Sequence, residues 1–267
     1  MAPHDVIDRV AELIREISAT AIEPLFDSLA SGDVREKSPG EVVTRADEDG
    51  ERMLTAALAP IVPGAAMLGE EACTAAPGLL DALGDGWSWL IDPLDGTSNF
   101  VAGSTDWAVM VALVRSGETV ASWIWRPATR RMYMAERGSG ATCNGQAVRT
   151  TPRDPDPRSL RGAVLRRFLD PPTNAAVERN STRFAHVGTG RMCAGSEYPA
   201  IADGEQDFVV FWRTLPWDHA PGALLVQEAG GVARRPDGTR YVPSARGEGL
   251  VVAADEEAWP VVRSILD

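Results

Sequence analysis

The spacing of hydrophobic residues changes from a helical to a strand pattern near residue 86, and this change limits the possible fold most strongly. Before it, residues 6–17 place apolar side chains on one face of an amphipathic helix. Further helical stretches are predicted up to about Leu29 and from about Ala46 to Leu58, where prolines follow. The segment 35–44 between these helices is predicted to be a loop.

Short strands dominate the middle of the chain. They are predicted at residues 87–91, 107–114, 119–125 and 131–135. Asn144-Gly145, flanked by short apolar segments, is the strongest hairpin signal in the sequence. These strands predict an antiparallel sheet.

Helices and strands mix in the last third. Strands are predicted at 163–168, 207–212 and 249–254, with helices at 197–203, at 217–229 and at the C-terminus. Residues 150–185 are rich in Pro, Arg and Asp, which favours a connection between two halves. The prediction is therefore a layered α+β fold with an N-terminal half at 1–150 and a C-terminal half at 151–267.

Charge and composition restrict the partners and the compartment. A net charge of -12 argues against nucleic acid or an anionic membrane as a partner, because both need a basic surface. A small anionic substrate remains compatible if metal ions make an acidic pocket locally positive. Three widely spaced cysteines indicate reduced thiols, and neither a signal peptide nor a long apolar run is recognisable. A cytoplasmic protein is expected.

The densest chemical signal follows the strand at 87–91. Asp92 and Asp95 lie in a turn in which Pro93 restricts φ and Gly96 relaxes it, so both carboxylates can point to one spot. The Leu94 carbonyl lies between them, and oxygen ligands of this kind suit a hard cation. Gly96-Thr97 would open a short helix whose free N–H groups can hold phosphate. The alternative is an ordinary surface turn, since Asp, Pro and Gly all favour turns.

Four motifs resemble the inositol monophosphatase family, and their order and spacing along the chain also fit it. They are Asp92–Thr97, Gly69-Glu70-Glu71, Trp217–Gly222 with Glu228–Gly231, and the weaker Val43–Asp47 after Lys37-Ser38. The family includes phosphatases of inositol phosphates, fructose 1,6-bisphosphate, histidinol phosphate and 3′-phosphoadenosine 5′-phosphate. The resemblance implies a layered αβαβα sandwich of the inositol monophosphatase and fructose-1,6-bisphosphatase type, a homodimer, and two to three Mg²⁺ ions.

The resemblance also implies roles for matching residues. A first ion would be bound by Glu70, Asp92, Asp95 and the Leu94 carbonyl, and a second by Asp92, Asp95 and Asp218. Glu70 with Asp47 would support a third, weaker ion. Gly96 and Thr97 would hold phosphate, and Thr97 with Glu70 would orient the attacking water. Each acidic residue has an alternative: Glu70 as a solvated surface charge, Asp218 as a helix cap, and Asp47 as a partner of its helix dipole.

Substrate-binding residues are expected mainly in the C-terminal half, where the sequence departs from the family. Phe211 replaces the inositol-contacting Glu that the family has seven residues before Asp218. The candidate contacts are Gly96, Thr97, Ser98, Gly195, Ser196, Glu197, Arg213 and Asp218. For Arg213, a buried ion pair with a helix-borne acid is an equal alternative to substrate contact. His219 is interpreted as a neighbour of Asp218 and not as a ligand.

The predicted reaction is hydrolysis of a small phosphorylated polyol or sugar, with inositol 1-phosphate first among the candidates. The other branches of the family are alternative substrates. Because Pro93 stands where a nucleophilic aspartate would be needed, no aspartyl-phosphate intermediate is expected. The alternative from another class is a regulatory binding protein with little turnover. The resemblance leaves this open, because some bacterial members of the family also serve as RNA-processing or antitermination partners.

Overall fold

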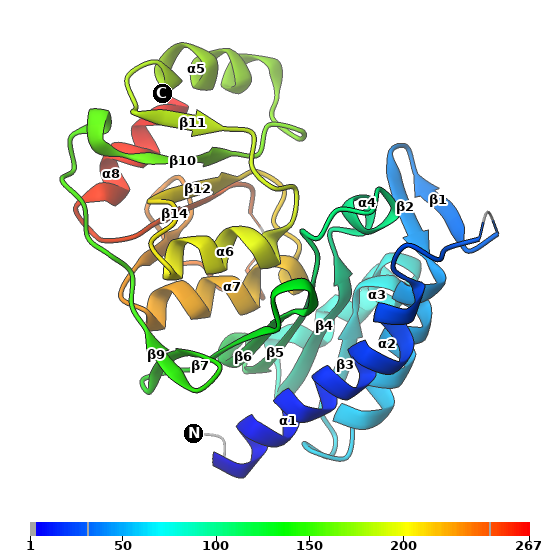
Figure 1. The fold of residues 1–267 in the computed structure, drawn as a ribbon. Coiled ribbons are helices and arrows are strands. Elements are labelled where there is room, and N and C mark those ends of the chain that lie inside the picture. The colour runs from blue at the N-terminus through cyan, green and yellow to red at the C-terminus, as the bar shows by residue number, and fades with distance from the viewer. Residues whose placement is uncertain (1–3, 31, 246) are drawn as a thin grey trace.

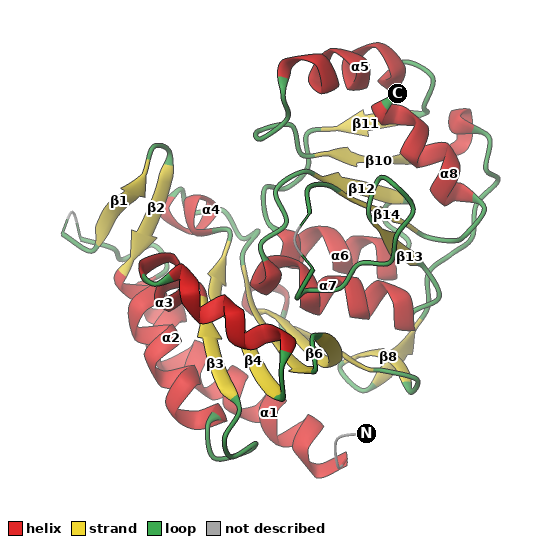
Figure 2. Cartoon of the chain, turned by 180° about the vertical axis from the view of Figure 1, so that it is seen from behind, coloured by secondary structure: helices red, strands yellow, loops and turns green. Residues whose placement is uncertain are grey.

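Helices and sheets alternate in five layers in the computed structural model, which describes residues 4–30, 32–245 and 247–267 (Figure 1). From one side to the other, the layers are two N-terminal helices, a seven-stranded sheet, two central helices, a five-stranded sheet, and two outer helices. Figure 2 shows the same order from behind. This is the αβαβα sandwich that the resemblance to the inositol monophosphatase family implied.

The first outer layer consists of α1 (His4–Ile17) and α2 (Arg45–Leu58), connected by a π-turn, a 3₁₀ turn and a hairpin. Their apolar faces pack on one face of the seven-stranded sheet, where Ile14 and Leu54 meet Trp89 and Trp123. The strand order of this sheet is β3-β4-β5-β6-β7-β8-β9. Its strands are β3 (Ala66–Gly69), β4 (Trp87–Asp95), β5 (Ala108–Arg115), β6 (Glu118–Arg126), β7 (Arg131–Glu136), β8 (Gly140–Cys143) and β9 (Gln146–Val148).

The middle layer is formed by α6 (Ala194–Ala202) and α7 (Pro216–Glu228), which fill the space between the two sheets. On β5, Ala108 and Met110 face these helices, whereas Val109 and Val111 face α1 and α2. This alternation is the two-residue period of a strand that is buried on both faces. Both central helices are therefore almost completely enclosed.

The second sheet has the order β11-β10-β12-β14-β13 and carries the last helical layer. Its strands are β10 (Arg161–Val164), β11 (His186–Gly188), β12 (Phe208–Phe211), β13 (Val232–Arg234) and β14 (Leu250–Ala253). Phe208 and Val210 turn outward to α5 (Pro171–Ser181) and α8 (Ala258–Arg263), while Val209 turns inward. No helix among the described residues is both long and apolar enough to span a membrane.

Several local predictions were wrong in ways that matter for the site. The predicted loop at 35–44 is a hairpin of β1 (Val34–Ser38) and β2 (Glu41–Thr44) that turns at Gly40, whose φ is +75°. The first sheet is mixed, because β3 pairs with β4 in parallel. The strand predicted at 163–168 ends at Val164, and the residues after it form a loop. The helix predicted at 197–203 begins three residues earlier, at Ala194.

The position of the boundary between the predicted halves stays a prediction. The first sheet takes its strands from residues up to Val148 and the second from residues after Leu160. The central helices, however, belong to the second segment and pack on both sheets.

Candidate metal and phosphate site

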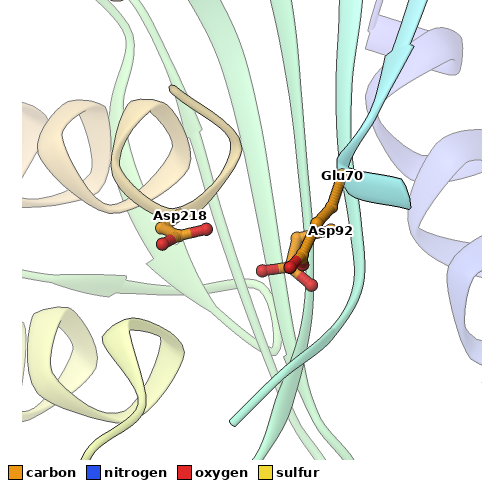
Figure 3. A group of neighbouring side chains, drawn as sticks. All are labelled: Glu70, Asp92 and Asp218. Carbon is orange, nitrogen blue, oxygen red and sulfur yellow. The ribbon is translucent and has the colours of Figure 1, made fainter. Parts of the chain in front are cut away.

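Three carboxylates from separate elements converge at one end of the seven-stranded sheet. Glu70 is the first residue of α3 (Glu70–Ala75), Asp92 lies near the end of β4, and Asp218 lies in the first turn of α7. Each offers an oxygen, and these oxygens lie within 4.8 Å of one another (Figure 3). Because α7 begins after Leu215, Asp218 is not the helix cap that was the alternative for it. Oxygen ligands in such a group suit Mg²⁺ or a similar hard cation.

A β-bulge near the end of β4 brings Asp95 to the same side as Asp92. Two residues three apart on a regular strand point to opposite faces. In β4, however, Asp92 pairs with Met110 and Asp95 pairs with Ala108, so one extra residue is accommodated between them. Met110 and Ala108 face the same layer. The turn at 92–95 is therefore a strand irregularity that orients two carboxylates, and not a surface turn.

Asp95 is held by the chain that enters α6. Its Oδ2 accepts hydrogen bonds from the Gly195 amide at 2.6 Å and from the Cys193 thiol at 3.0 Å. Gly96 follows with φ +86°, and a Cβ there would lie 2.8 Å from the Asp106 carbonyl oxygen. A glycine is thus required at the start of α4 (Thr97–Val101), as the sequence predicted.

Glu70 is oriented by a buried residue that the sequence analysis missed. Glu51, on α2, accepts hydrogen bonds from the amides of Glu71 at 2.7 Å and Ala72 at 3.0 Å, at the start of α3. A Cβ on Gly69 would lie 2.2 Å from the Glu51 carboxyl carbon, so only glycine fits between them. The Gly-Glu-Glu motif therefore has a structural reason for its glycine, namely close packing on Glu51.

Lys37, on β1, pairs with both glutamates of the Gly-Glu-Glu motif. Its Nζ lies 2.6 Å from Glu70 Oε1 and 2.7 Å from Glu71 Oε1, and all three side chains are less than a fifth exposed. Burial lowers the pKa of Lys37, but the charges and hydrogen bonds of the two glutamates outweigh it, so the pKa is raised overall. Glu70 is thus a half-buried, paired carboxylate and not a solvated surface charge.

Thr97 and Asp47 form a buried hydrogen-bonded unit behind the carboxylates. Thr97 Oγ1 lies 3.0 Å from Asp47 Oδ1 and 3.0 Å from the Leu94 carbonyl oxygen. Asp47 also accepts from the Thr44 amide and hydroxyl, which completes the capping box of α2. Burial raises the pKa of Asp47 to about 7. The helix-partner alternative for Asp47 is correct locally, and the contact with Thr97 adds a link to the site.

The carboxylates are buried close together, and their ionisation is therefore costly. Burial, followed by the charges of Glu70 and Asp95, raises the pKa of Asp92 well above its ordinary value, and the same causes raise the pKa of Asp218. Burial also raises the pKa of Asp95 to about 6, although its bonds to Cys193 and Gly195 oppose the rise. A divalent cation among these oxygens would remove the repulsion, so the donor set fits the ion that the sequence implied.

One cavity contains most of the predicted site residues. Those in its wall are Glu70, Asp92, Leu94, Asp95, Gly96, Thr97, Ser98, Arg213 and Asp218. Asp47 lies behind Thr97. Cys193 and Ala194 line the cavity where Gly195 and Ser196 had been expected.

Three predicted substrate contacts lie in the buried start of α6 and not in the cavity wall: Gly195, Ser196 and Glu197. The prediction that they contact the substrate is corrected for this reason. Glu197 is fully buried, accepts from the Gln206 amide at 2.7 Å, and also accepts from the Arg191 backbone. The error has a simple cause, because α6 begins earlier than predicted and places its second, third and fourth residues behind the wall. Gly195 nevertheless supports the site through its bond to Asp95.

His219 is a buried structural residue next to Asp218. Its Nε2 lies 3.0 Å from the Arg213 carbonyl oxygen, and its Nδ1 lies 2.9 Å from the Tyr198 hydroxyl. A carbonyl can only accept, so Nε2 carries the proton and Nδ1 accepts from Tyr198. Burial lowers the pKa of His219 to about 3, which keeps it neutral. The interpretation of His219 as a neighbour and not a ligand agrees with these bonds.

Comparisons with known proteins give one family over almost the whole chain. The model of the inositol monophosphatase family matches residues 5–265. The inositol-1-monophosphatase of Mesorhizobium japonicum is 33% identical over 235 residues, which cover 86% of this chain and 85% of that protein. The Nus factor SuhB of Pseudomonas aeruginosa is 34% identical over 228 residues, 80% of each chain. The crystal structure of extragenic suppressor protein suhB from Bartonella henselae superposes with a TM-score of 0.82 at 23% identity, over 98% of both chains, and shows the same fold.

Proposed function

This chain belongs to the inositol monophosphatase family of phosphatases, and we propose that it hydrolyses a small phosphorylated polyol or sugar with Mg²⁺. Inositol 1-phosphate is the first candidate substrate, supported by the similarity to the Mesorhizobium enzyme of that name. The observation that carries the proposal is the convergence of Glu70, Asp92 and Asp218 in the same cavity as Thr97.

Mg²⁺ would be held by the carboxylates of Glu70, Asp92, Asp95 and Asp218 together with the Leu94 carbonyl. When bound, Mg²⁺ supplies neutralisation of phosphate oxygens and a lowered pKa for water. We propose that the site binds two to three Mg²⁺ ions, the third of them near Glu70 and Asp47. The backbone N–H groups of Gly96 and Thr97 are proposed to contact the phosphate.

Thr97 is proposed to orient the attacking water. Its hydroxyl has one proton, and both neighbours at hydrogen-bond distance, Asp47 Oδ1 and the Leu94 oxygen, are acceptors. The proton is therefore committed to one of them, and the lone pairs of Thr97 Oγ1 remain to accept a proton of water. Glu70 would accept a hydrogen bond from the same water. Asp47 thus acts through Thr97, as a positioning residue.

Hydrolysis is proposed to occur without a covalent enzyme intermediate. Phosphoryl transfer to water needs positioning and charge stabilisation more than nucleophilic catalysis. The carboxylates of Asp92 and Asp95 are engaged as cation ligands in this scheme, and Pro93 offers no nucleophile. Isolation of a phosphorylated Asp92 or Asp95 after a rapid quench would contradict this part of the proposal.

Phosphate release from a substrate panel tests the proposal. The panel comprises inositol 1-phosphate, fructose 1,6-bisphosphate, histidinol phosphate, 3′-phosphoadenosine 5′-phosphate and glycerol 2-phosphate, each with and without Mg²⁺. We expect Mg²⁺-dependent turnover that Asp95→Asn abolishes, and the best substrate identifies the branch. Turnover that survives in Asp95→Asn would reject the metal site.

A second candidate is a regulatory binding function, favoured by the similarity to a protein named Nus factor SuhB. The net charge of -12 is unfavourable for direct RNA binding, so a protein partner is the form we consider. Absence of turnover on the whole panel, in a folded protein with Mg²⁺, would favour this candidate. A homodimer in the cytoplasm is proposed for either function.

A further inference from the structure

Two arginines and a phenylalanine form the outer wall of the cavity, above the carboxylates. We call Arg167, Phe168 and Arg213 the arginine rim. Arg167 and Phe168 lie in the loop after β10, and Arg213 lies in the turn between β12 and α7. Phe168 is 41% exposed although it is a large apolar residue. Residues with this exposure at the mouth of a cavity are available to a ligand.

Arg213 is fixed by contacts on three sides. Its guanidinium stacks on the Phe168 ring, with 4.1 Å between its central carbon and the ring centroid, and it forms an ion pair with Glu41 of β2. Its carbonyl oxygen accepts from the neutral His219 ring, which Tyr198 holds in turn. The predicted ion pair of Arg213 is thus with an acid on a strand and not on a helix. This arrangement leaves the side chain 39% exposed.

Arg167 is held beside it by the β1–β2 hairpin. Its Nη2 donates to the Gly40 carbonyl at 2.8 Å, and its guanidinium carbon lies 5.0 Å from the Phe168 centroid. A Cβ on Gly40 would lie 3.1 Å from Arg167 Nη2, so the glycine turn allows this approach. Both guanidiniums are therefore positioned around one aromatic ring, which restricts their side-chain entropy before any ligand binds.

The charge of the rim is positive in a strongly acidic chain. Glu41 balances one of the two arginines, and one positive charge remains. A guanidinium carries five N–H donors, and the bonds described here use only one nitrogen of each. The cavity wall also contains apolar or aromatic residues, besides the polar Lys37, Ser98 and Glu41: Val42, Leu165, Met192, Phe211 and Trp212. Hydroxyl groups of a neutral polyol find few acceptors on such a surface, whereas an anion finds paired donors.

We propose that the arginine rim binds a second anionic group, a phosphate or a carboxylate, on the leaving group of the substrate. The proposal rests on the proposed function, because it places the cleaved phosphate at the carboxylates and the second anion at the rim. The competing structural explanation is that the arginines only attach the hairpin to the C-terminal half. That explanation predicts no dependence on the charge of the substrate.

Two matched substrate pairs test the proposal. Fructose 1,6-bisphosphate and fructose 1-phosphate differ only by the second phosphate, and 6-phosphogluconate and glucitol 6-phosphate differ by a carboxylate in place of an alcohol. For the pair that carries the preferred anion, we expect wild-type kcat/KM to favour the doubly anionic compound by about 10- to 100-fold, the range of a charge-assisted contact. In Arg167→Gln and in Arg213→Gln this ratio should fall towards 1.

Arg166→Gln is the matched control. Arg166 neighbours Arg167 in the sequence but contacts Ser181 at 3.3 Å and lies outside the cavity wall. The control should keep the wild-type ratio, which separates rim binding from a general loss of positive charge. Equal kcat/KM for both members of both pairs, or a ratio unchanged in both rim variants, would overturn the inference.

Equilibrium binding keeps the inference testable if the proposed function fails. Calorimetry with Ca²⁺ in place of Mg²⁺ measures the affinity of the same compounds without relying on turnover. Tighter binding of the doubly anionic compound that both rim variants lose would support the rim even without hydrolysis. Equal affinities would reject it. Turnover of the compounds with only one anionic group, without any preference within a pair, would reject the rim and keep the proposed function.

Discussion

The carboxylates at the base of the cavity and the arginine rim at its mouth are built in opposite ways. The base takes one carboxylate each from α3 and α7 and two from β4, and buried neighbours hold it through backbone amides, as Gly195 does for Asp95. The rim lies on loops, keeps more than a third of Phe168 and Arg213 exposed, and is held by side-chain contacts. Exposed loops tolerate substitution better than enclosed backbone. We infer from this difference that the packed helices and strands position the groups for the reaction, whereas the loops determine which substrate binds.

Of the changes considered, Asp92→Asn at the base of the cavity should have the largest effect on activity. Removing one ligand charge should lower kcat/KM by about 10³-fold or more, because a bound cation contributes several kcal/mol to the transition state. The metal-free variant should be no less stable than the wild type, since the burial that raises the pKa of Asp92 penalises its charge. Phosphate-release kinetics and thermal unfolding in EDTA measure both effects. The exposed Asp85→Asn serves as control, and loss of activity through unfolding would contradict the prediction.

Thr97→Val should have the next largest effect, about 10²-fold on kcat. The change keeps the side-chain shape and removes the hydroxyl that contacts Asp47 and the Leu94 carbonyl. Thr97→Ser should recover most of the activity because it restores the hydroxyl. If valine and serine behave alike, the hydroxyl does not orient the water.

Glu51→Gln should reduce kcat/KM by about 10-fold and raise the Mg²⁺ concentration needed for half activity, as expected for a residue that orients a ligand. Glu51 holds the first turn of α3 through two amides and thereby directs Glu70. Glu48→Gln, on the same helix but exposed and paired with Arg35, is the control. If both variants need the same Mg²⁺ concentration for half activity, Glu51 does not influence the metal site through Glu70.

The pH dependence of stability should show the smallest effect. Burial raises the pKa of Asp47 to about 7 and of Asp95 to about 6, so the folded state binds more protons than the unfolded state between about pH 4 and pH 7. Stability of the metal-free protein should therefore fall by a few degrees in melting temperature from pH 5 to pH 7.5. His219, whose pKa burial lowers to about 3, acts in the opposite direction up to about pH 6.5, but it is one group, whereas Asp92 and Asp218 also have raised pKa values. Carboxylates with lowered pKa, such as Glu41 and Asp49, act in the opposite direction only at lower pH.

Added Mg²⁺ sharpens this last prediction. Because the cation binds the ionised carboxylates, its stabilisation should increase as the pH rises. Thermal unfolding at several pH values, with EDTA and with Mg²⁺, measures both curves. A metal-free protein that becomes more stable between pH 5 and pH 7.5 would contradict the description of the base as buried carboxylates whose ionisation is costly.

The sequence predicted the base of the cavity better than its mouth, for a physical reason. Asp92, Leu94, Asp95 and Gly96 are neighbours in one motif, so local turn chemistry already indicated their role. Glu51, Lys37 and Cys193 act across 20 to 98 positions of sequence, and their contacts arise only when the layers are assembled. For Glu51, the only sequence signal was Gly69, because a glycine in a motif can indicate that another group packs closely against the backbone there.

The fold was predicted well where the pattern was strong and missed where it was short. The long strands β4, β5 and β6 and the helices α2 and α7 have pronounced periodicity or clear end signals. In the β1–β2 hairpin, three consecutive charged residues, Arg35, Glu36 and Lys37, are followed by a Pro-Gly turn, so the segment resembles a loop. α6 was placed too late because its first turn contains Gly and Ser, which are weak helix formers. Tertiary burial, which encloses every residue of α6, decides its start.

The most direct measurement is the anomalous difference map of a crystal soaked with Mn²⁺ in place of Mg²⁺. The proposal predicts at least one Mn²⁺ peak among the carboxylates of Glu70, Asp92, Asp95 and Asp218, and loss of that peak in crystals of Asp92→Asn. Mn²⁺-supported turnover in solution, combined with no peak at these residues or with a peak elsewhere in the molecule, would contradict it.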